Sequence, residues 1–252
     1  MNTSDLSVRR RLGALSATAL AVLVVTGCGS SSPSHTNTTG TGTSTQPATT
    51  NTVPATNAAE DGRIARDAQL KLTDFPAGWE QQDSATESNS EAHCEGVDAA
   101  KAAVSARQTS PDFARASTDY AHSFTYVYVD VARASQAFSQ LASESTRTCL
   151  GEQLAKYLET QKKQGATIGK ITTSQVSMTP VGDEHAESRL TIPVSAQGVT
   201  ASFYVDLVFV RVGRGIAGFT LQSLLSPFRE SLSTELAKTV VDRLKAGLEQ
   251  AA

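Results

Sequence analysis

The spacing of apolar and polar residues predicts several β-strands in the second half of the chain. Residues 120–130 alternate strictly, so that one face of the strand carries aromatic rings and the other carries small or β-branched side chains. Four more segments combine β-branched and aromatic residues with flanking turn residues and are expected to be strands: 168–178, 186–196, 199–212 and 215–223.

Two glycine-containing turns join the last three of these strands. Gln197-Gly198 and the run Gly213-Arg214-Gly215 are both typical of tight hairpins. The strand between them, 199–212, is apolar on both faces, which predicts a central position with both faces mostly covered.

Apolar residues at helical spacing follow and precede the strands. From Phe228 to Leu248 they recur at every fourth position, which predicts a closing helix that starts at Ser226-Pro227. Residues 132–163 predict a helix with a break near Gly151, and the alanine-rich segment 95–108 also has helical character. The sequence therefore predicts an α+β fold, a twisted antiparallel sheet with helices packed on one face.

The N-terminal segment has the pattern of an export signal. Three arginines at 9–11 precede the uncharged apolar run 12–25, which is short for a membrane span. The run ends in Val25-Thr26-Gly27-Cys28, which resembles the bacterial lipobox. The resemblance implies that residues 1–27 are a lipoprotein signal peptide and that Cys28 receives the lipid. The alternative is an ordinary secretory signal that happens to contain a cysteine.

A long segment without charged residues follows Cys28. Residues 29–59 consist mainly of Ser, Thr, Gly, Asn, Pro and Ala and cannot form a core, so 28–59 is expected to be a lipidated cysteine plus a disordered tether. The sequence does not decide whether its threonines are glycosylated. All remaining apolar periodicity lies in 60–252, the expected globular domain.

The cysteines fit this division. With Cys28 assigned to lipid, Cys94 and Cys149 remain as an even pair, and in an exported domain a disulfide is the simplest interpretation. The alternative is a redox-active or metal-binding thiol pair, but no Cys-x-x-Cys or histidine spacing completes such a site.

Composition and motifs exclude several function classes. Lys and Arg total 22 against 25 Asp and Glu, so no basic excess favours a nucleic-acid partner. No nucleophile-elbow, zincin, phosphate-loop or dinucleotide motif occurs, and we expect no catalytic activity, no cofactor and no metal.

Two acidic features of the sequence have more than one interpretation. The segment 181–185, Val-Gly-Asp-Glu-His, has the carboxylates for a cation site, but a turn with Gly182 at positive φ is favoured. Asp206 interrupts an apolar strand and must be paired or hydrogen-bonded if it is buried; Arg211 or Arg214 is the expected partner, and the alternative is that Asp206 faces a polar groove.

The aromatic face of strand 120–130 is the candidate binding surface. Aromatic rings with polar tips suit a groove for an envelope lipid, glycan or peptide. The alternative is that this face packs beneath a helix as core. The candidate residues are Tyr120, His122, Phe124, Tyr126 and Tyr128.

Several segments together resemble known envelope proteins. The lipobox, the threonine-rich tether, the segment 72–79 and the paired cysteines resemble an actinobacterial, mycobacterial-type cell-envelope lipoprotein. Residues 60–250 are similar to the extracellular sensor domain of mycobacterial PknH-type kinases. The matching pieces are Ala137-Phe138 before a cysteine, Val181-Gly182-Asp183, the strand end Val210–Arg214 and the C-terminal amphipathic helix.

The resemblance implies a twisted antiparallel sheet with helices and a groove for an envelope ligand. The chain departs from the kinase domain because it has one candidate disulfide where that domain has two, and it lacks a kinase and a membrane helix. We therefore expect a non-catalytic ligand-binding or sensor-like module, lipid-anchored to the outer face of the plasma membrane. The alternative is a structural lipoprotein that acts through a protein partner without a small-molecule ligand.

Overall fold

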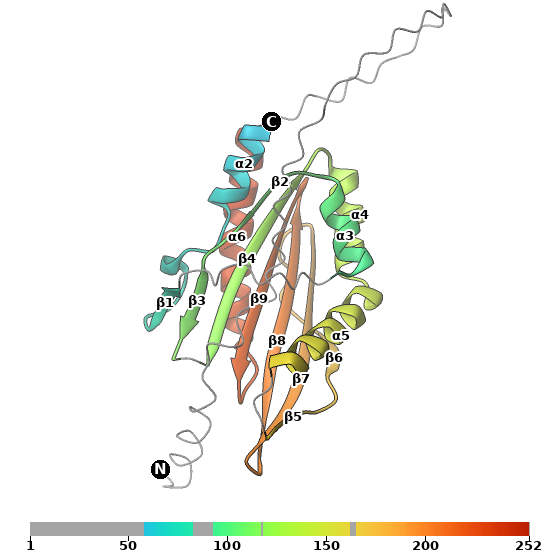
Figure 1. The fold of residues 1–252 in the computed structure, drawn as a ribbon. Coiled ribbons are helices and arrows are strands. Elements are labelled where there is room, and N and C mark those ends of the chain that lie inside the picture. The colour runs from blue at the N-terminus through green and yellow to red at the C-terminus, as the bar shows by residue number, and fades with distance from the viewer. Residues whose placement is uncertain (1–57, 83–92, 117, 162–164, 252) are drawn as a thin grey trace, which may run out of the picture.

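The computed structural model describes residues 58–82, 93–116, 118–161 and 165–251, which build one antiparallel sheet between two layers of helices (Figure 1). The strands in chain order are β1 (Trp79–Gln82), β2 (Val104–Thr109), β3 (Asp112–Arg115), β4 (Asp119–Tyr128), β5 (Ala166–Ile168), β6 (Thr172–Val176), β7 (Glu184–Ala196), β8 (Val199–Val212) and β9 (Gly215–Leu224). They pair in the order β1-β3-β4-β9-β8-β7-β5, with β2 also paired to β4 and β6 to β7.

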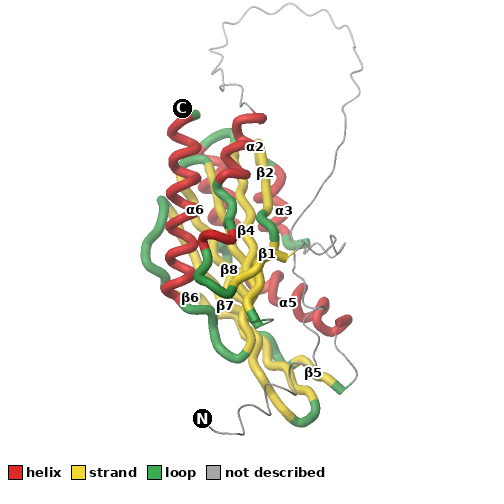
Figure 2. The backbone as a smooth tube through the Cα atoms, turned by 90° about the vertical axis from the view of Figure 1, so that its left-hand side faces the viewer, coloured by secondary structure: helices red, strands yellow, loops and turns green. Residues whose placement is uncertain are grey.

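The helices fall into two groups, one on each face of the sheet. They are α2 (Ala58–Asp67), the 3₁₀ turn η2 (Leu72–Asp74), α3 (Glu95–Ala102), α4 (Val131–Leu141), α5 (Glu144–Gln161) and α6 (Glu230–Gln250). Figure 2 shows α2 and α6 on one side of the strands and α3 and α5 on the other. α2 begins at Ala58, just inside the range 28–59 expected for the tether.

The α+β class and the antiparallel sheet are confirmed, but the expected placement of helices on one face must be corrected. β8 explains the difference, because its side chains alternate between two cores. Val208 and Val210 pack in the cluster that contains α2 and α6, while Phe209 packs in the cluster that contains α3 and α4. A strand that is apolar on both faces needs a cover on both.

The closing helix is confirmed, but it begins later than expected. The core-facing stripe of α6 is buried at Leu232, Leu236, Val240 and Leu244. The helix starts at Glu230, and Phe228 instead lies before it with its ring 6.0 Å from the ring of Trp79. Ser226 and Pro227 therefore lie before the helix and do not form its first turn.

Two further helix boundaries differ from expectation. The helix expected over 132–163 is interrupted at Ala142–Ser143 and not at Gly151, because the Ser143 hydroxyl accepts a hydrogen bond from the Thr146 backbone N–H, at 3.2 Å, at the start of α5. The segment 95–108 is helical only as far as Ala102; from Val104 it pairs with β4 as β2.

The hairpin turns are confirmed and fix the register of the sheet. Gln197 and Gly198 have φ of 52° and 76°, the left-handed pair that a two-residue turn between twisted strands requires. β7 and β8 therefore pair from Ala196↔Val199 to Glu184↔Arg211 without a shift.

Candidate ligand-binding groove

An apolar groove lies on the face of the sheet that α3, α4 and α5 cover. Its floor is formed mainly by the three neighbouring strands β4, β9 and β8, through Phe124 and Tyr126, Phe219, Thr220 and Gln222, and Phe203, Val205, Leu207 and Phe209. Its walls come from the helices, through Val97 of α3, Leu141 of α4 and Leu150, Leu154 and Tyr157 of α5. Among the described residues, no charged side chain lines the groove.

The groove is small and partly open. Its cavity volume is about 70 Å³, while the empty space along it reaches about 830 Å³ when the part open to solvent is counted. Typical small-molecule sites measure roughly 300–1,000 Å³. The enclosed part of the groove is therefore smaller than a typical small-molecule site, and the rest of it is open to solvent.

The aromatic face of β4 is divided between core and groove. Tyr128 is fully buried among α3 and α4, and its hydroxyl donates a hydrogen bond to the carbonyl oxygen of Ala100 at 2.9 Å. Burial raises the pKa of that hydroxyl, and the neighbouring Tyr126 adds to the rise. Phe124 and Tyr126 lie further along the strand and line the groove, with their ring centroids 4.7 Å apart.

The remaining two candidates on this face lie beyond the lining. Tyr120 is half-buried, and burial raises the pKa of its hydroxyl. His122 is 4% exposed, and its Nδ1 has no hydrogen-bond partner. Burial lowers the pKa of His122 to about 4, so its ring is neutral at physiological pH.

Two polar side chains of β9 lie on the groove floor, level with Leu207 and Val205 of β8. Thr220 pairs directly with His122 of β4, and Gln222 is the next residue on the same face. Both line the groove. Neither residue could be predicted from the sequence. The segment 215–223 does not indicate which of its polar residues lie next to the aromatic face of another strand.

The disulfide between Cys94 and Cys149 is confirmed. The two sulfur atoms are bonded, and the Cα atoms lie 5.9 Å apart. Cys94 is buried and immediately precedes α3, while Cys149 lies half-buried on α5. The bond therefore joins two helices that both contribute to the groove wall.

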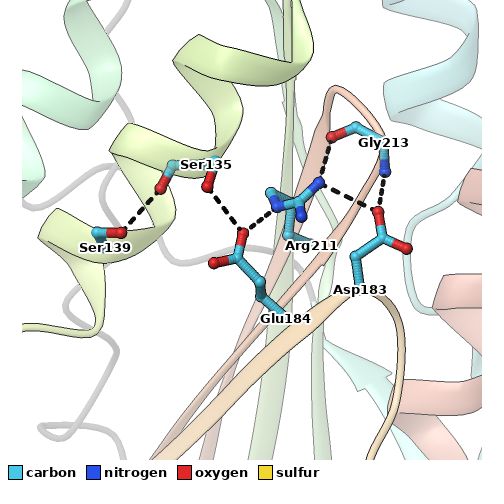
Figure 3. A network of polar contacts seen from close by, with 6 residues as sticks. All are labelled: Ser135, Ser139, Asp183, Glu184, Arg211 and Gly213. Carbon is cyan, nitrogen blue, oxygen red and sulfur yellow. Dashed lines mark hydrogen bonds and ion pairs between the residues drawn. The ribbon is translucent and has the colours of Figure 1, made fainter.

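The acidic segment 181–185 forms a turn whose carboxylates are neutralised by arginine (Figure 3). Gly182 has φ of 70°, and Asp183 accepts a hydrogen bond from the Gly213 backbone N–H at 2.7 Å. Arg211 donates to Glu184 and, at 3.1 Å, to Asp183, and the Ser135 hydroxyl of α4 donates to Glu184. The network ties the turn to the β8–β9 hairpin and to α4, as the turn interpretation predicted, and it leaves no acidic pair for a cation.

The partner expected for Asp206 is wrong. Arg189, directly opposite on β7, donates to both carboxylate oxygens of Asp206, at 2.7 and 2.8 Å. Arg211 pairs with Asp183 and Glu184 instead, and Arg214 pairs with Asp61 of α2. Glu187 lies nearby on β7, is 2% exposed and has an Oε2 without a partner.

Several expectations concern residues that the structure does not describe. The signal peptide, the lipidated Cys28 and most of the tether lie outside the described residues. Within the described ranges, no group of three or more His, Cys, Asp or Glu side chains is arranged to hold a metal ion. None of the helices in the same ranges is long and apolar enough to cross a membrane.

Comparisons with known proteins add no assignment. The chain matches no protein-family model, and no curated protein sequence is significantly similar to it.

Proposed function

We propose that this protein is a lipid-anchored envelope protein whose folded part binds an apolar ligand and has no catalytic activity. The observation that carries the proposal is the groove between the sheet and α3–α5, whose floor presents the rings of Phe124 and Tyr126. An apolar concave surface with a few polar groups at its edge is the usual form of a small-molecule site.

The export and anchoring part of the proposal is supported from two sides. The run 12–25 followed by Cys28 has the features of a lipoprotein signal. The disulfide between Cys94 and Cys149 is typical of a protein that folds in an oxidising compartment.

The alternative, a structural protein that acts only through a protein partner, has weaker support. Such a protein is expected to present a contiguous exposed apolar patch. In the described ranges, the large apolar side chains with high exposure are Leu72, Val131 and Leu225, which lie on three separate segments. The groove is the larger continuous apolar feature.

The binding site is tested by blocking the groove in the full-length chain. Leu207 is half-buried and lines the floor, so Leu207→Trp is expected to fill the groove. Thr200→Trp is the matched control, because Thr200 is exposed near the start of the same strand and does not line the groove. Lipids extracted from the purified proteins are then compared by mass spectrometry.

We expect a ligand to co-purify with the wild type and with Thr200→Trp but not with Leu207→Trp. An extract in which Leu207→Trp retains the same compounds would contradict binding in the groove. Retention of a protein partner with no small molecule in any extract would favour the structural alternative.

The anchor is tested separately by metabolic labelling with an alkyne-bearing fatty acid. The wild-type chain should incorporate the label, and Cys28→Ser should not, because the thiol at position 28 is the proposed acceptor. Equal labelling of both proteins would refute lipidation at Cys28 without bearing on the groove.

A further inference from the structure

The two cysteines of the disulfide differ in their exposure to solvent. Cys94 is 1% exposed, whereas Cys149 is half-buried on α5. In thiol–disulfide exchange a thiolate must reach one of the two sulfur atoms, so access helps to decide which sulfur is attacked. The difference in exposure therefore favours attack on Sγ of Cys149, with Sγ of Cys94 as the leaving group.

The position of Cys94 also suits a leaving thiolate. Cys94 is the N-cap of α3, next to the backbone N–H groups of the first helical turn, and a helix N-terminus stabilises a thiolate. A more stable thiolate is a faster leaving group. Glu95 and Asp98 in the same turn oppose this effect through their negative charge, so the difference in exposure is the stronger argument for the direction of attack.

The disulfide is one of two close contacts that hold the first turns of α5 against α3. The other contact is between Gly96 and Thr146, because a Cβ at position 96 would lie 2.1 Å from Oγ1 of Thr146. Thr146 and Cys149 are three residues apart and lie on the same face of α5. Two contacts about one turn apart fix the direction of the helix, whereas the contact at Thr146 alone would let α5 pivot.

The groove lies between the sheet and the part of α5 that follows the disulfide. Leu150, Leu154 and Tyr157 of this part line the groove, and Leu154 and Leu158 pack with buried residues of β7 and β8. A cavity deprives the side chains around it of packing contacts, so α5 is held less firmly here than a helix on a filled core. Loss of the disulfide is therefore expected to affect the groove before the rest of the fold.

We propose that the bond between Cys94 and Cys149 is a thiol–disulfide exchange site, and that its reduction by an external dithiol releases α5 from α3 and widens the groove. A thiolate of the dithiol attacks Sγ of Cys149, and the electron pair of the S–S bond leaves on Sγ of Cys94, which takes up a proton. The second thiol of the dithiol then forms a disulfide with the first and releases Cys149 as a thiol. Two electrons and two protons pass to the chain, and the dithiol is oxidised.

This inference goes beyond the proposed function. The exchange reaction needs no ligand, and the widening concerns the groove only as a cavity. Each measurement below is made without a ligand, so its failure is distinct from a failure of the proposed function.

The rate of reduction of the folded protein tests the exchange site. Full-length protein in phospholipid nanodiscs is treated with dithiothreitol over a wide range of concentrations, and free thiols are blocked with N-ethylmaleimide and counted by mass spectrometry. We expect the rate to rise in proportion to the dithiothreitol concentration, because the reagent attacks the folded protein. A rate that levels off at the rate of global unfolding, measured in urea and extrapolated to water, would overturn the proposal.

The monothiol glutathione tests the direction of attack, because it stops the reaction at the mixed disulfide. After the free thiol is blocked with N-ethylmaleimide, peptide mapping should find glutathione on Cys149 about tenfold more often than on Cys94. Equal amounts on the two cysteines, or an excess on Cys94, would overturn the assigned direction.

Hydroxyl-radical footprinting of the full-length protein tests the effect on the groove. The double variant Cys94→Ser/Cys149→Ser imitates the reduced state without a reductant that would consume the radicals. Oxidation of Phe124 and Tyr126 on the groove floor should rise several-fold relative to the wild type. Phe113 is the internal control, because it is 1% exposed in the core on the opposite face and should stay protected in a folded variant.

The internal control separates widening of the groove from unfolding. Unchanged oxidation of Phe124 and Tyr126, with Phe113 protected, would overturn the link between the disulfide and the groove. If Phe113 is oxidised as well, the variant is unfolded, and wild-type protein that has been reduced and freed of reagent without oxygen is footprinted in its place. The kinetic test with dithiothreitol uses the wild type and decides the exchange site in either case.

Discussion

Arg189 and Asp206 face each other across β7 and β8 and are joined by two hydrogen bonds between the guanidinium and the carboxylate. Asp206 is 1% exposed, and the Arg189 side chain is 20% exposed. Burial raises the pKa of Asp206, and the guanidinium opposes that rise. The carboxylate of Asp206 can therefore be charged inside the sheet only because Arg189 lies directly opposite it.

Removing one member of this pair is expected to cost more than removing both. Arg189→Met leaves the Asp206 carboxylate buried without a partner and should lower the free energy of unfolding by about 3 kcal/mol. The double variant Arg189→Met/Asp206→Leu should recover most of that loss, because well-packed apolar residues often replace a buried ion pair without penalty. Urea denaturation measures both, and a double variant as unstable as Arg189→Met would contradict the interpretation.

Glu187 is expected to make stability depend on pH. Burial raises its pKa to about 7, the charge of Asp206 adds to the rise, and Arg189 opposes it; Glu230 of α6 is a further negative neighbour. The folded state therefore holds a proton that the unfolded state releases near the ordinary glutamate value of 4.5. The contribution of Glu187 to stability is present below that value and is lost as the pH rises to about 7.

Glu187→Gln should remove this pH dependence. At about pH 8 the variant should be more stable than the wild type by about 3 kcal/mol, and at about pH 4 the two should be equal. Thermal melting across this range measures the difference. Glu235→Gln, at an exposed position of α6, is the matched control and should leave the pH profile of the wild type unchanged. If the stability of the wild type instead rises relative to Glu187→Gln between pH 5 and 7, the predicted direction of the pH dependence is wrong.

Gly218 is expected to be required for the position of Phe124 on the groove floor. The two residues pair across β4 and β9, and a Cβ at 218 would lie 2.2 Å from Cζ of the Phe124 ring. Gly218→Ala must therefore displace the ring and should cost about 1–3 kcal/mol of unfolding free energy. Calorimetry detects the change as a lower melting temperature.

A second glycine provides the control for that substitution. Gly62 lies within α2, and a Cβ there would meet nothing within 4 Å. Gly62→Ala should stabilise the protein by about 0.5–1 kcal/mol through helix propensity alone. Equal effects of the two substitutions would show that the contact with Phe124 is unimportant.

The disulfide is expected to contribute strongly to stability. It closes a loop with a sequence separation of 55, which corresponds to about 4 kcal/mol in the chain-entropy description. Cys149→Ser should therefore melt at a markedly lower temperature, and hydrogen exchange should increase first in α3 and α5. The wild type treated with a reductant serves as the comparison, and alkylation of both cysteines in unreduced protein would contradict the bond.

The sequence predicted strands better than it predicted partners. Alternation identified β4, and the two-sided apolar pattern of β8 correctly predicted a central strand. The local composition of 95–108 predicts a helix throughout, whereas the pairing of 104–109 with β4 depends on residues distant in the sequence. Non-local pairing of this kind overrides local propensity.

One missed contact was within reach of the sequence. Once Gln197-Gly198 is taken as a two-residue turn, counting back along both strands places Arg189 opposite Asp206 and Glu184 opposite Arg211. The polar residues of the groove floor were not accessible in this way. Thr220 meets His122 through the pairing of β4 with β9, strands whose register no short turn fixes.

The bond between Cys94 and Cys149 also has a mechanical consequence. It encloses α3, β2, β3, β4 and α4 within a covalent ring, so tension applied to the two ends of the polypeptide passes through the sulfur atoms and bypasses these elements. A stretched molecule should extend by roughly 190 Å less than its reduced form, at about 3.5 Å for each residue shielded from the pull. The strand that carries Phe124 and Tyr126 would thus be spared direct loading when the polypeptide is pulled from its two ends.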